Sequence, residues 1–296
     1  MLENKTNRVS YVSLNAGRDS AQQKWSAAPA YYLCPHMAGQ PFTVTFLGTG
    51  TSQGVPVIAC DCPVCTSTDP RDKRLRCAVL LSFGDKHYVI DAGPDFRQQM
   101  LRAQVKTLEA VLFTHEHKDH VAGLDDVRAY NFSMKRDMRI YGNTRVEETL
   151  KRDFHYAFAE VKYPGVPRLD FTEIDTRAFE VDGIRFQPVE VMHYKLPVLG
   201  FRVGDLTYIT DAKTISKEEK AKIRGSKTLV INALRKEEHI SHLNLDQALA
   251  LIEELEVETA YLTHLSHLMG LHADLVPQLP PHVHLAYDGL QIPATL

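Results

Sequence analysis

The chain has 296 residues, of which 44% are hydrophobic and 24% are charged. These proportions are typical of a globular protein with a buried core, and they exclude a collagen, a coiled coil or a wholly disordered chain. The formal net charge of −3 gives no overall field that would attract nucleic acid or an anionic membrane. No apolar run approaches the ~20 residues that cross a bilayer, and the first residues lack a signal peptide's apolar stretch, so we expect a cytoplasmic protein without membrane partners.

Residues 1–40 are polar and aperiodic, and they are predicted to be a disordered N-terminal extension, with a short docked arm as the alternative. Residues 41–296 are taken as the folded domain, because the run FTVTFLG from Phe42 alternates like a strand. Further strands are predicted at 77–83, 86–90, 110–113, 184–191, 199–203, 206–209, 229–231 and 259–262. Helices are predicted at 95–103, 121–131, 144–154, 216–223 and 245–254. This interleaving indicates an α/β protein whose sheets are covered by helices.

The segment THEHKDH, directly after the strand at 110–113, holds four potential metal ligands within six residues. His115 and His117 alternate along the chain and so can face one ion, while Asp119 and His120, around the turn, can face a second. Imidazole and carboxylate ligands suit Zn, Mn or Fe, and a pair of ions ~3.5–4 Å apart is a recurring device for hydrolysis. We therefore predict an enzyme with two divalent ions, Mn or Zn, at its active site.

The remaining ligands of such a site are expected at other strand ends, where a sheet presents its loops. His193, Asp211 and His264 each end a predicted strand. A lone histidine is more often a surface or hydrogen-bonded residue, so the H-x-H-x-D-H cluster carries most of the argument. The predicted assignment places Asp211 between two ions, one held by His115, His117 and His193 and the other by Asp119, His120 and His264.

The H-x-H-x-D-H loop is the hallmark of the metallo-β-lactamase-fold hydrolases, and the chain resembles that family. Within it, the chain is most similar to the phosphoribosyl 1,2-cyclic phosphodiesterases of phosphonate degradation, the C–P lyase pathway. The segments that carry this similarity are FLGTG at 46–50, CDCPVC at 60–65, IDAG at 90–93, HLNL at 242–245, HLSH at 264–267 and YDGL at 287–290. The similarity runs from about Phe42 to Ile292. It implies a four-layer αββα sandwich with a dinuclear site at one edge, and the seven ligands above fall on the family's ligand positions.

The five cysteines form no disulfide framework by their number and spacing. Cys60, Cys62 and Cys65 are close enough to bind one structural zinc, but they need a fourth ligand. His267, three residues past His264, is the best candidate, and the resemblance implies the same choice. The alternative is three reduced cysteines in a surface loop. Cys34 and Cys77 are interpreted as a residue of the extension and a small core residue.

The predicted reaction is attack on phosphorus by a hydroxide that bridges the two ions, which also neutralise charge on a phosphoryl oxygen. A histidine is expected to protonate the departing oxygen. His242, in the polar loop Arg235–His242, is the candidate on the position that the resemblance implies, and His239 is its competitor. Asp119 is a second catalytic candidate, because it can orient the attacking water while it coordinates. Weaker candidates for binding the substrate phosphate are Thr49, Thr51, Ser52, Arg235 and Lys236.

The predicted function is therefore a phosphodiesterase for a small cyclic phosphodiester similar to phosphoribosyl 1,2-cyclic phosphate. One alternative is a tRNA 3′-processing endonuclease, but the sequence shows no basic, Gly-rich arm that would hold tRNA, and we expect no nucleic acid partner. Others are a thioester or lactone hydrolase of the same fold and a metal-binding protein without activity. Composition leaves a homodimer open.

Overall fold

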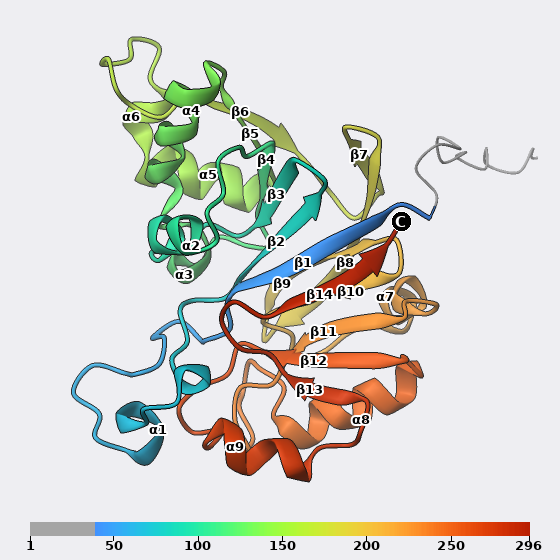
Figure 1. The fold of residues 1–296 in the computed structure, drawn as a ribbon. Helices are drawn as coiled ribbons and strands as arrows, with labels where there is room; N and C mark the ends of the chain where they lie inside the picture. Colours follow the sequence, from blue (N-terminus) through green and yellow to red (C-terminus); the bar gives the residue numbers. More distant parts are fainter. Residues whose placement is uncertain (1–38) are drawn as a thin grey trace, which may run out of the picture. The chain divides into compact units, whose positions relative to one another are not determined.

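The computed structural model describes residues 39–296, so Cys34 and nearly all of the predicted extension lie outside the described range. The described residues form two seven-stranded sheets, with strand orders β14-β1-β2-β3-β4-β5-β6 and β13-β12-β11-β10-β9-β8-β7 (Figure 1). The first sheet consists of β1 (Pro41–Gly48), β2 (Ala78–Phe83), β3 (Lys86–Ile90), β4 (Ala110–Leu112), β5 (Met138–Gly142), β6 (Leu169–Glu173) and β14 (Gln291–Thr295). The second consists of β7 (Phe179–Val181), β8 (Ile184–His193), β9 (Leu196–Val203), β10 (Leu206–Tyr208), β11 (Thr228–Asn232), β12 (Thr259–Thr263) and β13 (Val283–Leu285).

The central strands are apolar at nearly every position because both of their faces are covered. In β2, Val79 and Leu81 pack into the core between the two sheets, whereas Ala78 and Leu80 pack against helices on the outer face. Successive side chains of a strand point to opposite faces, so one short strand contributes to two cores. Continuous apolar runs of this kind are expected where a sheet is buried on both sides.

Helices form the two outer layers. Those on the first sheet are α2 (Phe96–Arg102), α3 (Lys118–Val121), α4 (Arg128–Met134), α5 (Thr144–Asp153) and α6 (His155–Phe158). Those on the second sheet are α7 (Lys217–Ile223), α8 (Leu245–Leu255) and α9 (His272–Leu275). Short turns of helix lie in the loops: α1 (Pro63–Thr66), η1 (Pro70–Asp72), η2 (Leu124–Val127) and η3 (Val276–Gln278). The predicted four-layer αββα sandwich is therefore confirmed.

The helix predicted at 121–131 is wrong as a single element. The chain forms α3, η2 and α4 in its place, with a turn at Gly123. The amide of Gly123 donates to the carbonyl of Ala92, and a Cβ on Gly123 would lie only 2.0 Å from the carbonyl oxygen of Gly93. The backbone at Gly123 packs closely against the loop after β3. This contact interrupts the helix that the sequence pattern predicts.

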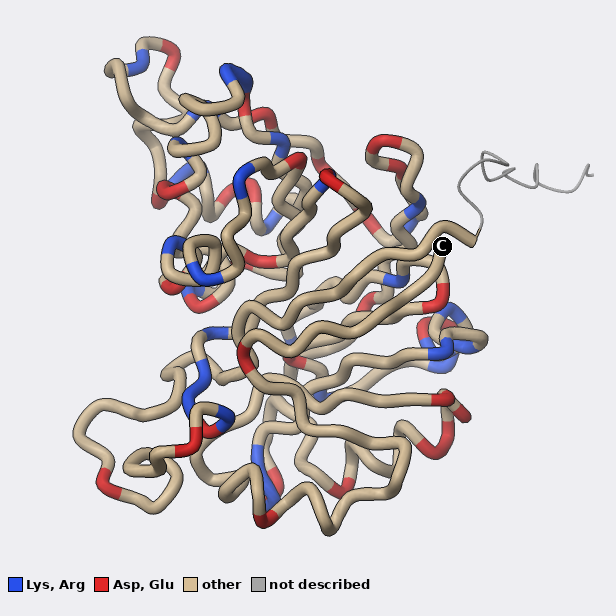
Figure 2. The backbone as a smooth tube through the Cα atoms, in the orientation of Figure 1, with Lys and Arg blue, Asp and Glu red and all other residues tan. Residues whose placement is uncertain are grey.

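Charged residues gather away from the central strands. Figure 2 shows acidic and basic residues interleaved over helices and loops, while β1, β12 and β14 carry none. Within residues 39–296, no helix combines the length and the apolarity that a membrane crossing requires. The cytoplasmic location and the oligomeric state stay predictions.

Candidate active site

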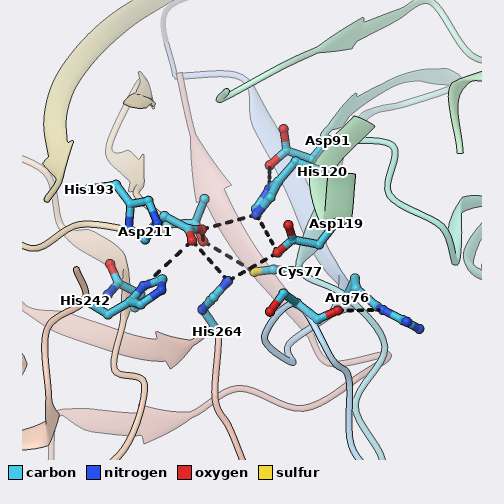
Figure 3. Close-up of polar contacts among 12 residues, drawn as sticks. Arg76, Cys77, Asp91, Asp119, His120, His193, Asp211, His242 and His264 are labelled. Atoms are coloured by element: carbon cyan, nitrogen blue, oxygen red, sulfur yellow. Dashed lines mark hydrogen bonds and ion pairs between the residues drawn. The ribbon is translucent and has the colours of Figure 1, made fainter. Parts of the chain in front are cut away.

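The loops that follow one strand of the first sheet and three of the second meet at one edge of the two sheets. His115 and His117 follow β4, and Asp119 and His120 lie in the short helix α3. From the second sheet, His193 ends β8, Asp211 follows β10 and His264 follows β12. Figure 3 shows the side chains of Asp119, His120, His193, Asp211 and His264 directed toward one another.

The three histidines assigned to the first ion lie side by side. The ring centroids of His115 and His117 are 4.6 Å apart, those of His117 and His193 are 5.2 Å apart, and those of His115 and His193 are 6.1 Å apart. Among the described residues, however, His117 contributes to none of the groups whose ligand atoms all lie within 4.8 Å of one another. The three side chains nevertheless share one region.

The ligand atoms assigned to the second ion are closer together. The Nε2 atom of His120 is 3.3 Å from an oxygen of Asp119 and 3.3 Å from Asp211 Oδ2. The Nε2 atom of His264 is 3.2 Å from Asp211 Oδ1 and 3.9 Å from Asp119 Oδ2. The two oxygens of Asp211 therefore face different imidazoles, and this carboxylate lies at the centre of the cluster.

Residues behind the cluster fix which imidazole nitrogen points inward. Asp91 Oδ2 is 2.7 Å from Nδ1 of His120, and the carbonyl of Ser241 is 2.8 Å from Nδ1 of His193. These acceptors favour the tautomer with the proton on Nδ1, which leaves Nε2 free as a ligand. Asp91 was not among the predicted site residues, although it lies in the IDAG segment at the end of β3.

Three residues of the cluster have a left-handed backbone. Asp91, Asp211 and His264 have φ angles of 69°, 58° and 55°. A residue other than glycine in this region carries strain of ~1–3 kcal/mol and persists where the surroundings hold it. Asn232 stabilises the backbone next to Asp211. Its buried side chain accepts a hydrogen bond from the amide of Ala212 at 2.7 Å and donates one to the carbonyl of Ala212 at 3.0 Å.

The donor set fits divalent cations. The Nε2 atoms of His115, His120 and His264 are buried and have no hydrogen-bond partner. A buried polar atom without a partner is costly, and a metal ion is one way to satisfy a ring nitrogen that lies beside carboxylates. Burial alone would lower the pKa of His120, but the charges of Asp91, Asp119 and Asp211 outweigh it and raise that pKa well above the usual value. The site thus has an excess of negative charge that a cation would neutralise.

His242 lies on the second-sheet side of the cluster. Its ring centroid is 4.4 Å from that of His193 and 4.9 Å from that of His264, and its Nδ1 is 3.7 Å from Asp211 Oδ1. Burial, aided by the nearby His264, lowers the pKa of His242 to about 3. The competitor His239 is farther out, with its Nδ1 accepting from the amide of Ser241 at 3.3 Å. His242 is therefore the histidine of this loop that reaches the cluster.

The three thiols of the first loop converge on one nitrogen. Nδ1 of His267 lies 3.3, 3.4 and 3.5 Å from the Sγ atoms of Cys60, Cys62 and Cys65. A tetrahedral zinc site with ordinary Zn–S and Zn–N bonds has sulfur-to-nitrogen edges of about 3.5 Å, so these distances fit a Cys3His site. The amide of Cys65 lowers the pKa of Cys62 to about 6, whereas burial raises the pKa of Cys65 to about 11. Cys77 is buried, as expected of a core residue.

The Gly-rich loop after β1 contains Thr49, one of the weaker candidates for binding the substrate phosphate. Thr49 is fully buried, and its hydroxyl donates to Asp288 and accepts from Arg74, both at 2.8 Å. Its hydroxyl therefore makes two internal hydrogen bonds, one of which ties the loop to Asp288 in the C-terminal segment. Arg235 donates to the carbonyl of Glu238 at 2.8 Å, which closes the loop that carries His242.

Comparisons with known proteins agree with this geometry. A model of the beta-lactamase superfamily domain matches residues 86–265. A protein of Porphyromonas gingivalis named octanoyltransferase is 41% identical over 248 residues, or 83% of this chain and 50% of that protein. The chain thus spans about half the length of this curated relative. Ribonuclease Z of Mycobacterium sp. (strain KMS) is 26% identical over 215 residues, or 66% of this chain and 69% of that enzyme.

Among solved structures, a diphosphatase of the PhnP family superimposes with a TM-score of 0.81 and 38% identity, covering 86% of this chain and 98% of that one. Its match includes nearly the whole described fold, and the family model covers the cluster from the strand β3 to His264 and Leu265. The chain therefore belongs to the beta-lactamase superfamily and has the metallo-β-lactamase fold.

Proposed function

We propose that the chain is a metal-dependent phosphodiesterase that hydrolyses a small cyclic phosphodiester similar to phosphoribosyl 1,2-cyclic phosphate. The observation that carries this proposal is the convergence of seven histidine and aspartate side chains, three of which present buried imidazole nitrogens without a hydrogen-bond partner. The similarity to a PhnP-family diphosphatase at 38% identity supports a phosphorus-containing substrate.

In this proposal, His115, His117 and His193 would hold one ion and Asp119, His120 and His264 the other. Asp211 would be a ligand as well. Two such ions, Mn or Zn, would lower the pKa of a water molecule and neutralise charge on a phosphoryl oxygen. Asp91 and the carbonyl of Ser241 keep the imidazoles oriented through their Nδ1 atoms. For His120 and His193, the second hydrogen bond that fixes the ring orientation is thus already formed.

Two residues are proposed to take part in the reaction directly. Asp119, whose carboxylate faces both His120 and His264, would orient the attacking water. His242 would protonate the departing sugar oxygen. Its pKa of about 3 leaves it neutral in the absence of substrate, but an anionic phosphate beside the ring favours the protonated form.

The Cys60–Cys62–Cys65–His267 group is proposed to hold one structural zinc. His267 lies three residues after His264, so a closed metal site here would tie the first loop to the loop that carries an active-site ligand. Structural zinc sites of this kind contribute to folding stability and not to the reaction.

A nuclease is the second candidate, because Ribonuclease Z is 26% identical to this chain over 215 residues. Acidic and basic residues are interleaved along the described backbone (Figure 2), and the formal net charge of −3 gives no overall positive field for a phosphate backbone. A substrate screen separates the two candidates.

The screen would follow hydrolysis of bis(p-nitrophenyl) phosphate, ribose cyclic phosphates, a precursor tRNA and a thioester, together with elemental analysis of the purified protein. We expect two active-site ions and fastest turnover of a cyclic phosphodiester. Asp211→Asn should lose the ions and the activity, whereas Asp170→Asn, at an exposed carboxylate of β6, should retain both. Preferred cleavage of tRNA or of the thioester would replace the proposed function.

A further inference from the structure

Three of the strand ends that carry a residue of the cluster have a threonine directly before that residue. The pairs, which follow or end β4, β10 and β12, are Thr114–His115, Thr210–Asp211 and Thr263–His264. All three threonines are fully buried. A buried hydroxyl destabilises the fold unless it forms hydrogen bonds, so the partners of each hydroxyl indicate what it does.

The three hydroxyls have different partners. Thr263 Oγ1 lies 3.3 Å from the Sγ of Cys77, in the core between the two sheets. Thr210 Oγ1 donates to Asp211 Oδ2 at 2.6 Å. Of the three, Thr114 alone has its hydroxyl within hydrogen-bond distance of the imidazole of the ligand that follows it.

The direction of the hydrogen bonds of Thr114 follows from its partners. Its Oγ1 is 2.9 Å from Oδ2 of Asp91 and 2.9 Å from Nδ1 of His115. A carboxylate only accepts, so the single hydroxyl proton goes to Asp91, and the hydroxyl oxygen accepts from His115. If the hydroxyl donated to His115 instead, two oxygen atoms without a proton between them would face each other at 2.9 Å. The proton of His115 is therefore expected on Nδ1.

Asp91 is thus connected with two imidazoles. Its Oδ2 also accepts from Nδ1 of His120 at 2.7 Å (Figure 3), and its Oδ1 accepts from the amide of Thr114 at 2.9 Å. Both bonds leave Nε2 without a proton, and the Nε2 atoms of His115 and His120 are buried without a partner. His115 is assigned to the first ion and His120 to the second, so one buried carboxylate is connected with a ligand of each.

We propose that Thr114 is a positioning residue, whose hydroxyl connects His115 to Asp91 and so keeps Nε2 of His115 available as a metal ligand. The inference rests on the proposed function for the presence of the ions. Without the hydroxyl, Nδ1 has no acceptor, and the form of His115 that is protonated on Nε2 becomes populated. Hydrogen-bond partners of metal ligands typically change metal affinity about 10- to 100-fold when they are removed.

The test determines the tautomer by NMR of isotope-labelled histidine rings in the metal-free protein. The His115 signals are assigned by their loss in His115→Gln. Wild type and Thr114→Ser, which keeps the hydroxyl, should show His115 protonated on Nδ1, whereas Thr114→Val should show it protonated on Nε2. Chelator competition should in turn show about 10- to 100-fold weaker binding of the strand-end ions to Thr114→Val.

Thr263→Val is the matched control, because Thr263 is equally buried and directly precedes a ligand, but its hydroxyl bonds to Cys77. It should keep the His115 tautomer and the ion affinity of the wild type. A purely structural Thr114 would lower only the melting temperature of Thr114→Val, and an unchanged tautomer and affinity in that variant would overturn the proposal.

The wild-type spectrum decides if Thr114→Val does not fold. His115 protonated on Nε2 overturns the proposal, whereas protonation on Nδ1 in both wild type and Thr114→Ser supports it. The proposed function fails separately, if the wild type binds no ions at the strand ends. The spectrum would then show whether the hydrogen bonds from His115 through Thr114 to Asp91 exist without them.

Discussion

At the scale of single residues, Asp91 decides which nitrogen of His120 is available. Its carboxylate accepts from Nδ1 of His120 at 2.7 Å, and it also accepts from the amide and hydroxyl of Thr114. A carboxylate can only accept, so Nδ1 must carry the proton and Nε2 faces Asp119 and Asp211. Asp91 is not a proposed ligand, but it determines which ring nitrogen of His120 can bind an ion.

Asp91→Asn is expected to weaken metal binding about 10- to 100-fold. An asparagine can turn its NH2 group toward Nδ1, which moves the imidazole proton to Nε2 and blocks the ligand atom. Asparagine also tolerates the left-handed backbone at this position, so the fold should be kept. Chelator competition with metal analysis measures the effect, with Asp170→Asn as the control. Equal metal affinity in both variants would remove Asp91 from the site.

His242→Ala is expected to keep the metals and slow turnover, by about 100-fold for diesters with poor leaving groups and far less for p-nitrophenyl esters. A good leaving group departs without a proton, so only the poor one needs an acid. His239→Ala is the control, because His239 lies farther from the cluster and bonds to Ser241. Equal slowing with both kinds of leaving group would show that His242 is not the acid.

At the scale of elements, most internal strands were predictable, whereas the internal strand β5 and the edge strands β6, β7, β13 and β14 were missed. The strand β3 covers the predicted residues 86–90. The strand β11 extends one residue beyond its predicted range of 229–231 at each end. By contrast, β6 was missed, since its side chains are mostly exposed and carry no periodic apolar signal. The residues that meet at the cluster were predictable because they lie at strand ends or in the loop and short helix after β4. Asp91 was not, because its contact with His120 depends on which loops the fold brings together.

One ionic group links the two sheets and gives a pH-dependent prediction. Asp182, in the β7–β8 turn, accepts from both terminal nitrogens of Arg139 in β5, at 2.9 and 2.7 Å, and from the hydroxyl of Tyr88 in β3 at 2.7 Å. The Arg139 guanidinium, assisted by the Tyr88 hydroxyl, lowers the pKa of Asp182 to about 2. The carboxylate therefore stabilises the fold at pH values above the unfolded pKa of about 4, and this contribution is lost as pH falls from about 4 toward 2.

Asp182→Asn should lower the melting temperature at pH 7 by a few degrees and by progressively less below pH 4. Asparagine preserves the left-handed turn, since it tolerates the φ of 54° at this position. Thermal melts of the two proteins across this pH range measure the difference. A difference in melting temperature that stays constant down to pH 2 would mean that the charge of Asp182 does not stabilise the fold.

The first loop gives a further prediction at this scale. Cys62→Ser should release one zinc per chain and lower the melting temperature, because it removes a ligand that joins residues 60–65 to His267. The ions at the strand ends should be retained. Cys77→Ser, at a buried cysteine outside the group, is the control for zinc content. Unchanged zinc in Cys62→Ser would leave the three thiols as ordinary reduced cysteines.

At the scale of the whole molecule, the candidate site draws on both sheets. The loop after β4 comes from the first sheet and the loops after β8, β10 and β12 come from the second. The core between the sheets fixes their relative position through residues such as Phe46, Tyr88, Phe186 and Phe201. Ligands that are far apart in the sequence are thus positioned by packing, and metal binding should in turn stabilise the packed state.

Removal of the metals is therefore expected to lower the melting temperature of the whole fold. An ion present at about 100 times its Kd stabilises the folded state by ~2.7 kcal/mol, which corresponds to roughly 5–10 °C for a domain of this size. In wild type, the chelator-induced decrease should contain contributions from both metal groups. In Cys62→Ser, the chelator should remove only the stabilisation by the ions at the strand-end ligands. In Asp211→Asn, it should remove only the stabilisation by the zinc at the cysteine group. A melting temperature that does not change with chelator in any of the three proteins would contradict metal binding at both places.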